Sequence, residues 1–501
     1  MADYDSAYTG AQIDTGIGKA YTALQSADIE TALSTSGKAA DAKATGDAIT
    51  ALEARLGVVN AFNIIGLEVD FENKTFKRLG AAYGKSKGAD FNAFPMYGNR
   101  KRCNVTDGGV VTAYYGDTGY TETGALTQAV TVNGITYPVG TTVQVMVEQP
   151  KFYYCVYPLK IQSQASGGGI GYHLRKVAYY ICGEQLPGFK LYPAFYDESG
   201  NEIDKVYIGA YDGCAYDVSA SAYITNDAQS IDFTASTGDK FSSIAGVKPA
   251  SGATQNFTRA NLETICKNRG DGWHSFDVRI ASMEQLLMVI EFGTMNVQTG
   301  SGSNGITSIT DVSPNSCSSI TGSTASLGNA SWQASSTTDW QGNSQSADGK
   351  TAYSFRGVEN PWGNVWKLIE GVNVWGDGTM HGGVPYICKD YVFTESKKTD
   401  NYESAGFSIT NASGYINAMG YSEKFNWLMI PSEIGGNTSL PVGDYVYVTA
   451  NLNGYNITRV GGSWADGASG GSFYWGTVYG VDGHSRTVGG RLVYIPQMQS
   501  T

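Results

Sequence analysis

Histidine and cysteine are the side chains of this chain that could ligate a metal or attack a substrate, and both are widely scattered. No histidine has another histidine or cysteine three or four residues away, the spacing that sets two ligands on one helix face. The cysteine count is odd and no Cys-x-x-Cys pair occurs. We expect buried thiols made in a reducing cytoplasm, with no metal site, no catalytic residue and no cofactor. These residues are His173, His274, His381, His484, Cys103, Cys155, Cys182, Cys214, Cys266, Cys317 and Cys388.

Three other patterns in the sequence are typical of sites that carry chemistry. The glycine-rich run at 166–171 precedes a predicted strand and lacks the lysine of a phosphate loop, so it indicates a flexible turn. Asp377 and Asp482 each stand beside glycine and could ligate calcium, although lone Asp-Gly pairs more often form turns. A carboxylate pair for glycoside cleavage depends on distance through space, which the sequence does not give.

The residues from Arg459 to Pro496 form the most informative stretch. A front block, Gly461–Trp464, and a back block, Gly489–Pro496, flank a softer middle. The back block alternates as a strand does, whereas Gly476–Thr487 shows neither the helical nor the strand period. Rigid ends around an unconstrained middle are typical of a recognition surface, in which loops carry the contacts. The alternative is an ordinary glycine-rich loop between two strands.

This stretch resembles the variable region of proteins that diversity-generating retroelements diversify. The resemblance rests on the GGSW motif ending at Trp464, on Trp475 eleven residues later, and on the closing GGRLVYIP. It implies a C-type-lectin-like fold of the formylglycine-generating-enzyme type. It also implies that Trp464, Trp475 and Arg491 are scaffold residues, while the residues between and just after the anchors vary and bind a ligand.

The predicted ligand-binding residues all lie between the two anchors. They are Ala465, Asp466, Ala468, Ser469, Tyr474, Gly476, Val478, Tyr479, Val481, Asp482, His484, Ser485 and Thr487.

The same fold family includes a copper-dependent oxidase, which uses a cysteine pair after its GGS-aromatic motif. In this chain the stretch from Ala465 to Trp475 contains no cysteine, and Cys388 is about seventy residues upstream. Without thiolates there is neither a soft-metal site nor that type of nucleophile. We therefore expect no oxidase activity and no enzyme.

Composition narrows the classes of partner. The net charge of −12 argues against nucleic acid, because phosphate binding needs clustered lysine and arginine. The one basic cluster, Arg100–Arg102, is predicted to be a solvated loop. No apolar run approaches the ~18 residues that span a membrane, and no signal peptide is recognisable. The 64 glycines and 33 tyrosines favour loop-rich β structure, and tyrosine suits recognition loops.

Residues 1–57 differ from the rest in being nearly free of large aromatic side chains. Small and aliphatic residues from Ala42 to Leu56 follow the 3-4 spacing of a short coiled-coil seam. Two heptads are marginal alone, so the seam predicts partner chains and a homotrimer, the alternative being a helix packed on its own domain. YTGAQIDTGIGKA and SGKAADAKATGDAI resemble the attachment region and trimerising helix of bacteriophage tail-fibre proteins.

The predicted fold class is α+β. Its parts are a helical attachment and trimerisation segment (1–57), a β-rich spacer (58–145) and a C-type-lectin-like receptor-binding domain (146–501) with its variable region at 459–496. Helices are predicted at Thr258–Asn268 and at Ala281–Phe292, the latter with Ser282 and Gln285 as a capping box. The Asn133-Gly134 pair predicts a hairpin, and residues 298–350 read as a long surface insertion.

Together these observations predict a phage tail-fibre adhesin in the virion tail that binds a host-cell-surface glycan or protein. The expected partners are two further copies of the chain and, through the N-terminus, other tail or baseplate proteins. Two alternatives stay open, a glycan-cleaving fibre enzyme and a purely structural fibre or baseplate protein.

Overall fold

The computed structural model describes residues 63–252, 255–310, 313–379, 381–394 and 399–498. Within these ranges strands dominate, with thirty strand segments against four α-helices. The predicted α+β class is therefore wrong, and the described chain is mostly β-sheet. Short runs of alternating Val, Ile, Tyr and Thr outnumber the helical patterns predicted for these ranges. The predicted helical segment 1–57 lies outside the described residues.

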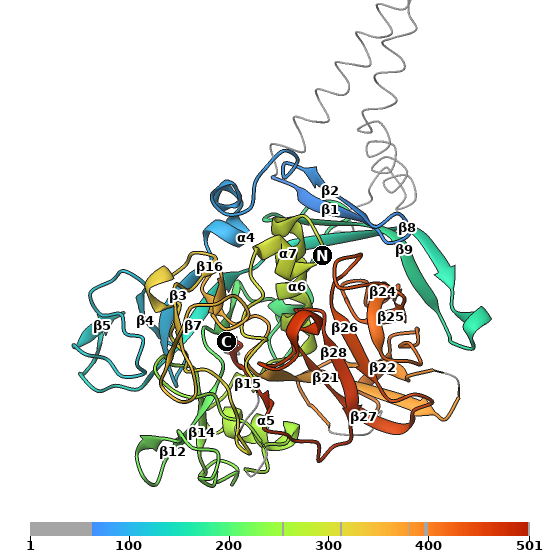
Figure 1. The fold of residues 1–501 in the computed structure, drawn as a ribbon. Helices are drawn as coiled ribbons and strands as arrows, with labels where there is room; N and C mark the ends of the chain where they lie inside the picture. The colour runs from blue at the N-terminus through green and yellow to red at the C-terminus, as the bar shows by residue number, and fades with distance from the viewer. Residues whose placement is uncertain (1–62, 253–254, 311–312, 380, 395–398, 499–501) are drawn as a thin grey trace, which may run out of the picture.

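The largest sheet has fourteen strands, and ten of them form a continuous path. In order they are β10 (Lys190–Leu191), β8 (Tyr153–Ser163), β9 (Tyr172–Cys182), β24 (Gly414–Tyr421), β26 (Tyr445–Val448), β28 (Trp475–Tyr479), β27 (Asn453–Val460), β21 (Trp366–Asp377), β22 (Val384–Cys388) and β23 (Tyr402–Ser404). The other four are β1 (Ile65–Asp70), β2 (Thr75–Gly80), β25 (Pro431–Ile434) and β29 (Val488–Gly489). Strands that are far apart in sequence lie side by side in this sheet, as where β9 pairs with β24 and β21 pairs with β27 (Figure 1).

A second sheet has six strands. In order they are β15 (Trp273–Ser275), β30 (Leu492–Tyr494), β11 (Lys205–Gly209), β7 (Val143–Pro150), β3 (Lys101–Thr106) and β4 (Val111–Tyr114). The alternation of the closing block predicted a strand, and that strand, β30, lies between β15 and β11. Four small sheets complete the described part. Two have three strands, namely β12 (Cys214–Asp217), β13 (Ala222–Tyr223) and β14 (Lys240–Ser242) in one and β16 (Trp332–Gln333), β19 (Tyr353–Phe355) and β20 (Val358–Glu359) in the other. Two are strand pairs, β17 (Thr337–Thr338) with β18 (Ser344–Gln345) and β5 (Val130–Val132) with β6 (Ile135–Tyr137).

The predicted hairpin is confirmed between β5 and β6, where Asn133 and Gly134 both have positive φ. Strand pairs also cross the predicted boundary between residues 145 and 146. β1 pairs with β9, and β3 pairs with β7. The main hydrophobic core runs from Ile65 to Ile495, so the predicted spacer and receptor-binding parts share sheets and a core.

The four helices are α4 (Pro95–Gly98), α5 (Arg259–Lys267), α6 (Val278–Phe292) and α7 (Val297–Ser301). Helix α5 is confirmed with its predicted cap, because the Thr258 side chain accepts a hydrogen bond from the Asn261 backbone N–H. Helix α6 begins earlier than predicted. Its cap is Asp277, which accepts from the N–H groups of Arg279 and Ile280, so the Ser282–Gln285 capping box was wrong. All fifteen residues of α6, near the centre of the molecule in Figure 1, are buried, so every face of this helix packs in the core.

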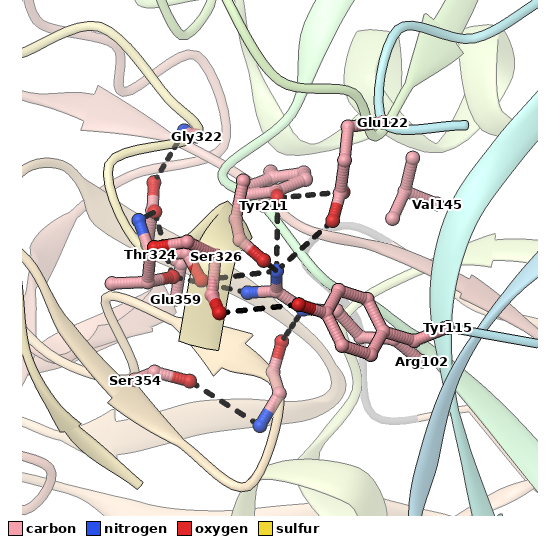
Figure 2. A network of polar contacts seen from close by, with 12 residues as sticks. Arg102, Tyr115, Glu122, Val145, Tyr211, Gly322, Thr324, Ser326, Ser354 and Glu359 are labelled. Atoms are coloured by element: carbon pink, nitrogen blue, oxygen red, sulfur yellow. Dashed lines mark hydrogen bonds and ion pairs between the residues drawn. The ribbon is translucent and has the colours of Figure 1, made fainter. Parts of the chain in front are cut away.

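The Arg100–Arg102 cluster is not a solvated loop, because both arginines are buried. Arg100 forms a two-point ion pair with Glu284 of α6, at 2.6 and 2.7 Å. Arg102 donates to the Gly357 carbonyl, at 2.8 Å, and to Thr324 Oγ1, at 3.0 Å (Figure 2). Buried arginines need such partners, and partners distant in sequence are not visible in a three-residue pattern.

The same hydrogen-bond network fixes part of the predicted insertion at 298–350 to the rest of the protein. Glu359 accepts hydrogen bonds from the Gly322 and Thr324 backbone N–H groups, at 2.9 and 2.7 Å (Figure 2). Further along, Ile306, Cys317 and Ala334 pack with Trp464 in a small core. The segment is therefore a packed cover over the GGSW motif in its described residues, and the expectation of a plain surface insertion was incomplete.

Candidate ligand-binding surface

The three predicted scaffold residues are fully buried. Trp464 is 0% exposed, and Trp475 and Arg491 are each 1% exposed. Trp475 donates its indole N–H to the Met429 carbonyl, at 3.1 Å. These anchors fix both ends of the C-terminal stretch, because each is held by a different part of the core.

Between the anchors, most of the predicted ligand-binding residues reach solvent. Eleven of the thirteen are at least partly exposed. They are Ala465, Asp466, Ala468, Ser469, Val478, Tyr479, Val481, Asp482, His484, Ser485 and Thr487.

The other two, Tyr474 and Gly476, are buried. The Tyr474 ring packs against Trp366, with ring centroids 4.4 Å apart. Gly476 lies in β28, which continues to Tyr479, so the first third of the supposedly unpatterned loop is a strand. Glycine at a strand position hides the period, because it contributes no side chain to the pattern.

Arg459 lies at the centre of this surface, between two aromatic rings. Its guanidinium carbon is 4.5 Å from the ring centroid of Trp366 and 4.1 Å from that of Tyr479. Such stacking over ring faces is favourable for a cation. Arg459 is 7% exposed, and within the described part of the chain its Nε and Nη1 have no hydrogen-bond partner.

Gly476 explains how the arginine fits. Arg459 on β27 is the register partner of Gly476 on β28, and Tyr447 on β26 is its partner on the other side. A Cβ at Gly476 would come 2.8 Å from Arg459 Nε, too close for an undisturbed contact. The missing side chain therefore lets Arg459 lie flat across β28. Since register partners in a sheet project from the same face, Tyr447 stands on the same face and is 45% exposed.

Asp466 and Ser469, on the loop after Trp464, lie at the margin of this face. Burial raises the pKa of Asp466, although hydrogen bonds from Ser463 and the charge of Arg459 act in the opposite direction. Asp466 Oδ2 accepts from the Ser463 backbone N–H and hydroxyl, at 2.6 and 2.7 Å. The Ser469 hydroxyl is 3.3 Å from the hydroxyl of Tyr415 on β24.

The last part of the loop lies against other segments. The Gly252 backbone N–H donates to the Ser485 carbonyl, at 3.0 Å, and Trp366 N–H donates to the Thr487 carbonyl, at 2.9 Å. The exposed His484 ring contacts the Asp482 carbonyl, at 2.8 Å, and has no acid or cysteine in a metal-ligating arrangement. The predicted residues therefore form two groups, one around Arg459 and one beside Gly252.

Sequence reasoning missed Arg459, Trp366 and Tyr447 as members of this surface. The Tyr445-Val446-Tyr447-Val448 alternation was the available signal, since a period of two puts both tyrosines on one face. Nothing local marks Arg459 or Trp366, which come from the two strands of the β21–β27 pair.

The described residues hold no group of three or more His, Cys, Asp or Glu that could ligate a metal. All seven cysteines are free, buried thiols, and burial raises the pKa of Cys214 and Cys388 to about 12. Asp377 accepts from Thr379 N–H and hydroxyl, as in a turn. Among the described helices, none is long and apolar enough to cross a membrane.

Comparison with known proteins yields similarity to solved structures alone. No protein-family model matches the chain, and no curated protein matches it. A solved structure described as "Major Tropism Determinant P3c Variant" is similar at 12% sequence identity, over 79% of this chain and 71% of that chain, with a TM-score of 0.25. A similarity at that TM-score carries no argument about the fold or the activity of this chain.

Proposed function

We propose that this chain is a bacteriophage tail-fibre adhesin that binds a host-cell-surface glycan or protein through the loop surface at 465–487. One observation carries the proposal. The anchors Trp464, Trp475 and Arg491 are buried, while eleven of the thirteen residues expected to vary between them are at least partly exposed. Side chains on such a surface can change without disturbing the core, which is what a diversified binding region requires.

The remaining parts of the proposal follow the sequence resemblance. Residues 1–57 attach the chain to other tail or baseplate proteins and join three copies, in the virion tail. Three sites on one stalk turn a modest affinity into avidity, by a factor of ~10²–10⁴. The chain needs no cofactor and is not an enzyme, since the stretch after Trp464 lacks the cysteine pair of the copper oxidase.

The test is binding of the purified chain to a panel of bacterial strains. Replacing Val481, Asp482, His484 and Ser485 together should change which strains bind, or remove binding, without changing Tm. Lys190→Gln is the matched surface control, because Lys190 is exposed and lies on β10, away from this loop in the sequence and in the sheet order. Unaltered strain binding by the loop variant would contradict the proposal.

The two alternatives give different results in the same assay. A glycan-cleaving fibre releases reducing sugar from the bound surface, whereas a structural fibre protein binds no strain. A reverse-transcriptase gene and template repeat near the gene for this chain would count against the structural alternative.

A further inference from the structure

The unpartnered guanidinium of Arg459 has no structural explanation within the described residues. Its two faces are covered by Trp366 and Tyr479, yet its Nε and Nη1 have no hydrogen-bond partner. Buried donors in folded proteins are almost always paired, and an unpaired one costs free energy. Arginine meets the two oxygens of an acceptor through Nη2 together with either Nε or Nη1, and in Arg459 both Nε and Nη1 are free for such a pair.

We propose that the edge of Arg459, together with the exposed ring of Tyr447, binds a carboxylate-bearing sugar of the host surface. This deepens the proposed function and rests on it. Arginine presents a planar fork of N–H donors that matches the two oxygens of a carboxylate, and such charge-assisted pairs are strong and directional.

The arrangement of the strands supports a sugar rather than an isolated anion. Tyr447, Gly476 and Arg459 are register partners across three adjacent strands, so Tyr447 and Arg459 stand two strand spacings apart, about 10 Å. Gly476 lies between them without a side chain. An apolar sugar face can rest on the tyrosine ring, whose hydroxyl supplies a polar contact, while the acid group of the sugar reaches the arginine.

Ligand entry requires one local change. Arg459 Nε and Nη1 are shielded from water in this structure, and the Tyr479 ring covers one face of the guanidinium. Tyr479 is the last residue of β28 and is partly exposed. Side-chain rotations of this kind are common when partners bind. Tyr479 therefore acts as a movable cover, and a different residue at this predicted variable position would alter access to a fixed arginine.

The experiment measures binding of the purified full chain to a galacturonate oligosaccharide and to the same oligosaccharide with its carboxyl groups reduced to alcohols. The parent chain should bind only the acidic form. Arg459→Gln should weaken that binding by roughly 10- to 100-fold, as expected for loss of hydrogen bonds to a charged group. Arg459→Lys keeps the positive charge but loses the planar pair of N–H donors. Its affinity for the acidic oligosaccharide should lie between the affinities of the parent chain and of Arg459→Gln.

Tyr447→Ala keeps the test decisive if Arg459→Gln unfolds, because Tyr447 is exposed and its loss should leave Tm unchanged. It should also weaken binding of the acidic form, and Lys190→Gln should not. Equal binding of both oligosaccharides, no binding of either, or full binding by Arg459→Gln would overturn the carboxylate site.

Strain binding, measured in parallel, separates the two proposals. If strains bind through the loop while the acidic oligosaccharide does not bind, the carboxylate site is wrong and the adhesin proposal stands. If no strain binds at all, the adhesin proposal itself is wrong, and the carboxylate site falls with it.

Discussion

Arg491 and Asp212 are 279 positions apart in the sequence and form a fully buried ion pair, with Nη2 of the arginine 2.8 Å from Oδ1 of the aspartate. Lys367 Nζ lies 3.4 Å from the same carboxylate. Burial lowers the pKa of Lys367 to about 8, although the charge of Asp212 acts to raise it. One carboxylate thus joins the closing GGRLVYIP block to the start of β21, and it balances two buried cations.

Removing that carboxylate should destabilise the fold strongly. Asp212→Asn keeps the shape but leaves Arg491 and Lys367 buried without a counter-ion, which should cost roughly 3–5 kcal/mol in the free energy of unfolding. Denaturant unfolding measures the change, and the exposed Asp482→Asn is the control for loss of one negative charge. A cost below about 1 kcal/mol would show that the pair does not hold the C-terminal block.

The buried anchors and the exposed loop should respond differently to truncation. Trp464→Ala and Trp475→Ala should each cost roughly 3–5 kcal/mol, as large-to-small changes in a core do. Asp482→Ala should stay within ~0.5 kcal/mol. Tyr479→Ala should cost about 1 kcal/mol, since it removes the ring that stacks on Arg459. Thermal unfolding of the four variants, together with strain binding, checks this. If Asp482→Ala unfolds the protein, the distinction between buried scaffold residues and exposed ligand-binding residues is wrong.

His274 should make stability depend on pH. Burial lowers the pKa of this histidine, but Glu263 and the hydrogen bonds to Glu198 and Glu263 outweigh it and raise the pKa to about 9. The charged form is therefore favoured in the folded state. Its contribution is fully present below the ordinary histidine pKa near 6.5 and is lost as pH rises through about 9, a change on the order of 3 kcal/mol.

His274→Gln should remove most of that pH dependence between pH 6.5 and 9, as measured by denaturant unfolding across the range. His484→Gln is the control, because His484 is exposed on the loop. If the free energy of unfolding of His274→Gln falls between pH 6.5 and 9 as steeply as that of the parent chain, other groups cause the pH dependence.

The chain should form a homotrimer through the predicted seam from Ala42 to Leu56, which lies outside the described residues. Small residues at two seam positions contribute little apolar burial, so downstream contacts must add to it. Light scattering should give three times the 53.4 kDa of one chain. A monomer at micromolar concentration would rule the trimer out.

Copper should have no effect on this protein. The stretch from Ala465 to Trp475 has no thiol, and burial holds the pKa of the Cys388 thiol near 12, so this group is not a ready thiolate. Incubation with copper and a cysteine-containing peptide should give no turnover above the metal alone. Copper-dependent turnover that saturates with peptide would overturn the expectation.

The sequence by itself determined the features that depend on neighbouring residues. Asn133-Gly134 specified a hairpin, and Thr258 specified the start of α5, because turn and cap geometry are local. The GGSW and GGRLVYIP blocks were recognisable as rigid ends, and Trp464 of the first and Arg491 of the second are buried.

Only the tertiary structure decided which residues meet. The burial of Arg100 and Arg102 and the packing of 298–350 over Trp464 depend on partners more than 100 positions away in the sequence. Arg459 is the clearest case. Its place between Trp366 and Tyr479 arises because β21, β27 and β28 are neighbours in one sheet, and strand order in a sheet is set by the whole fold rather than by the pattern of any one strand.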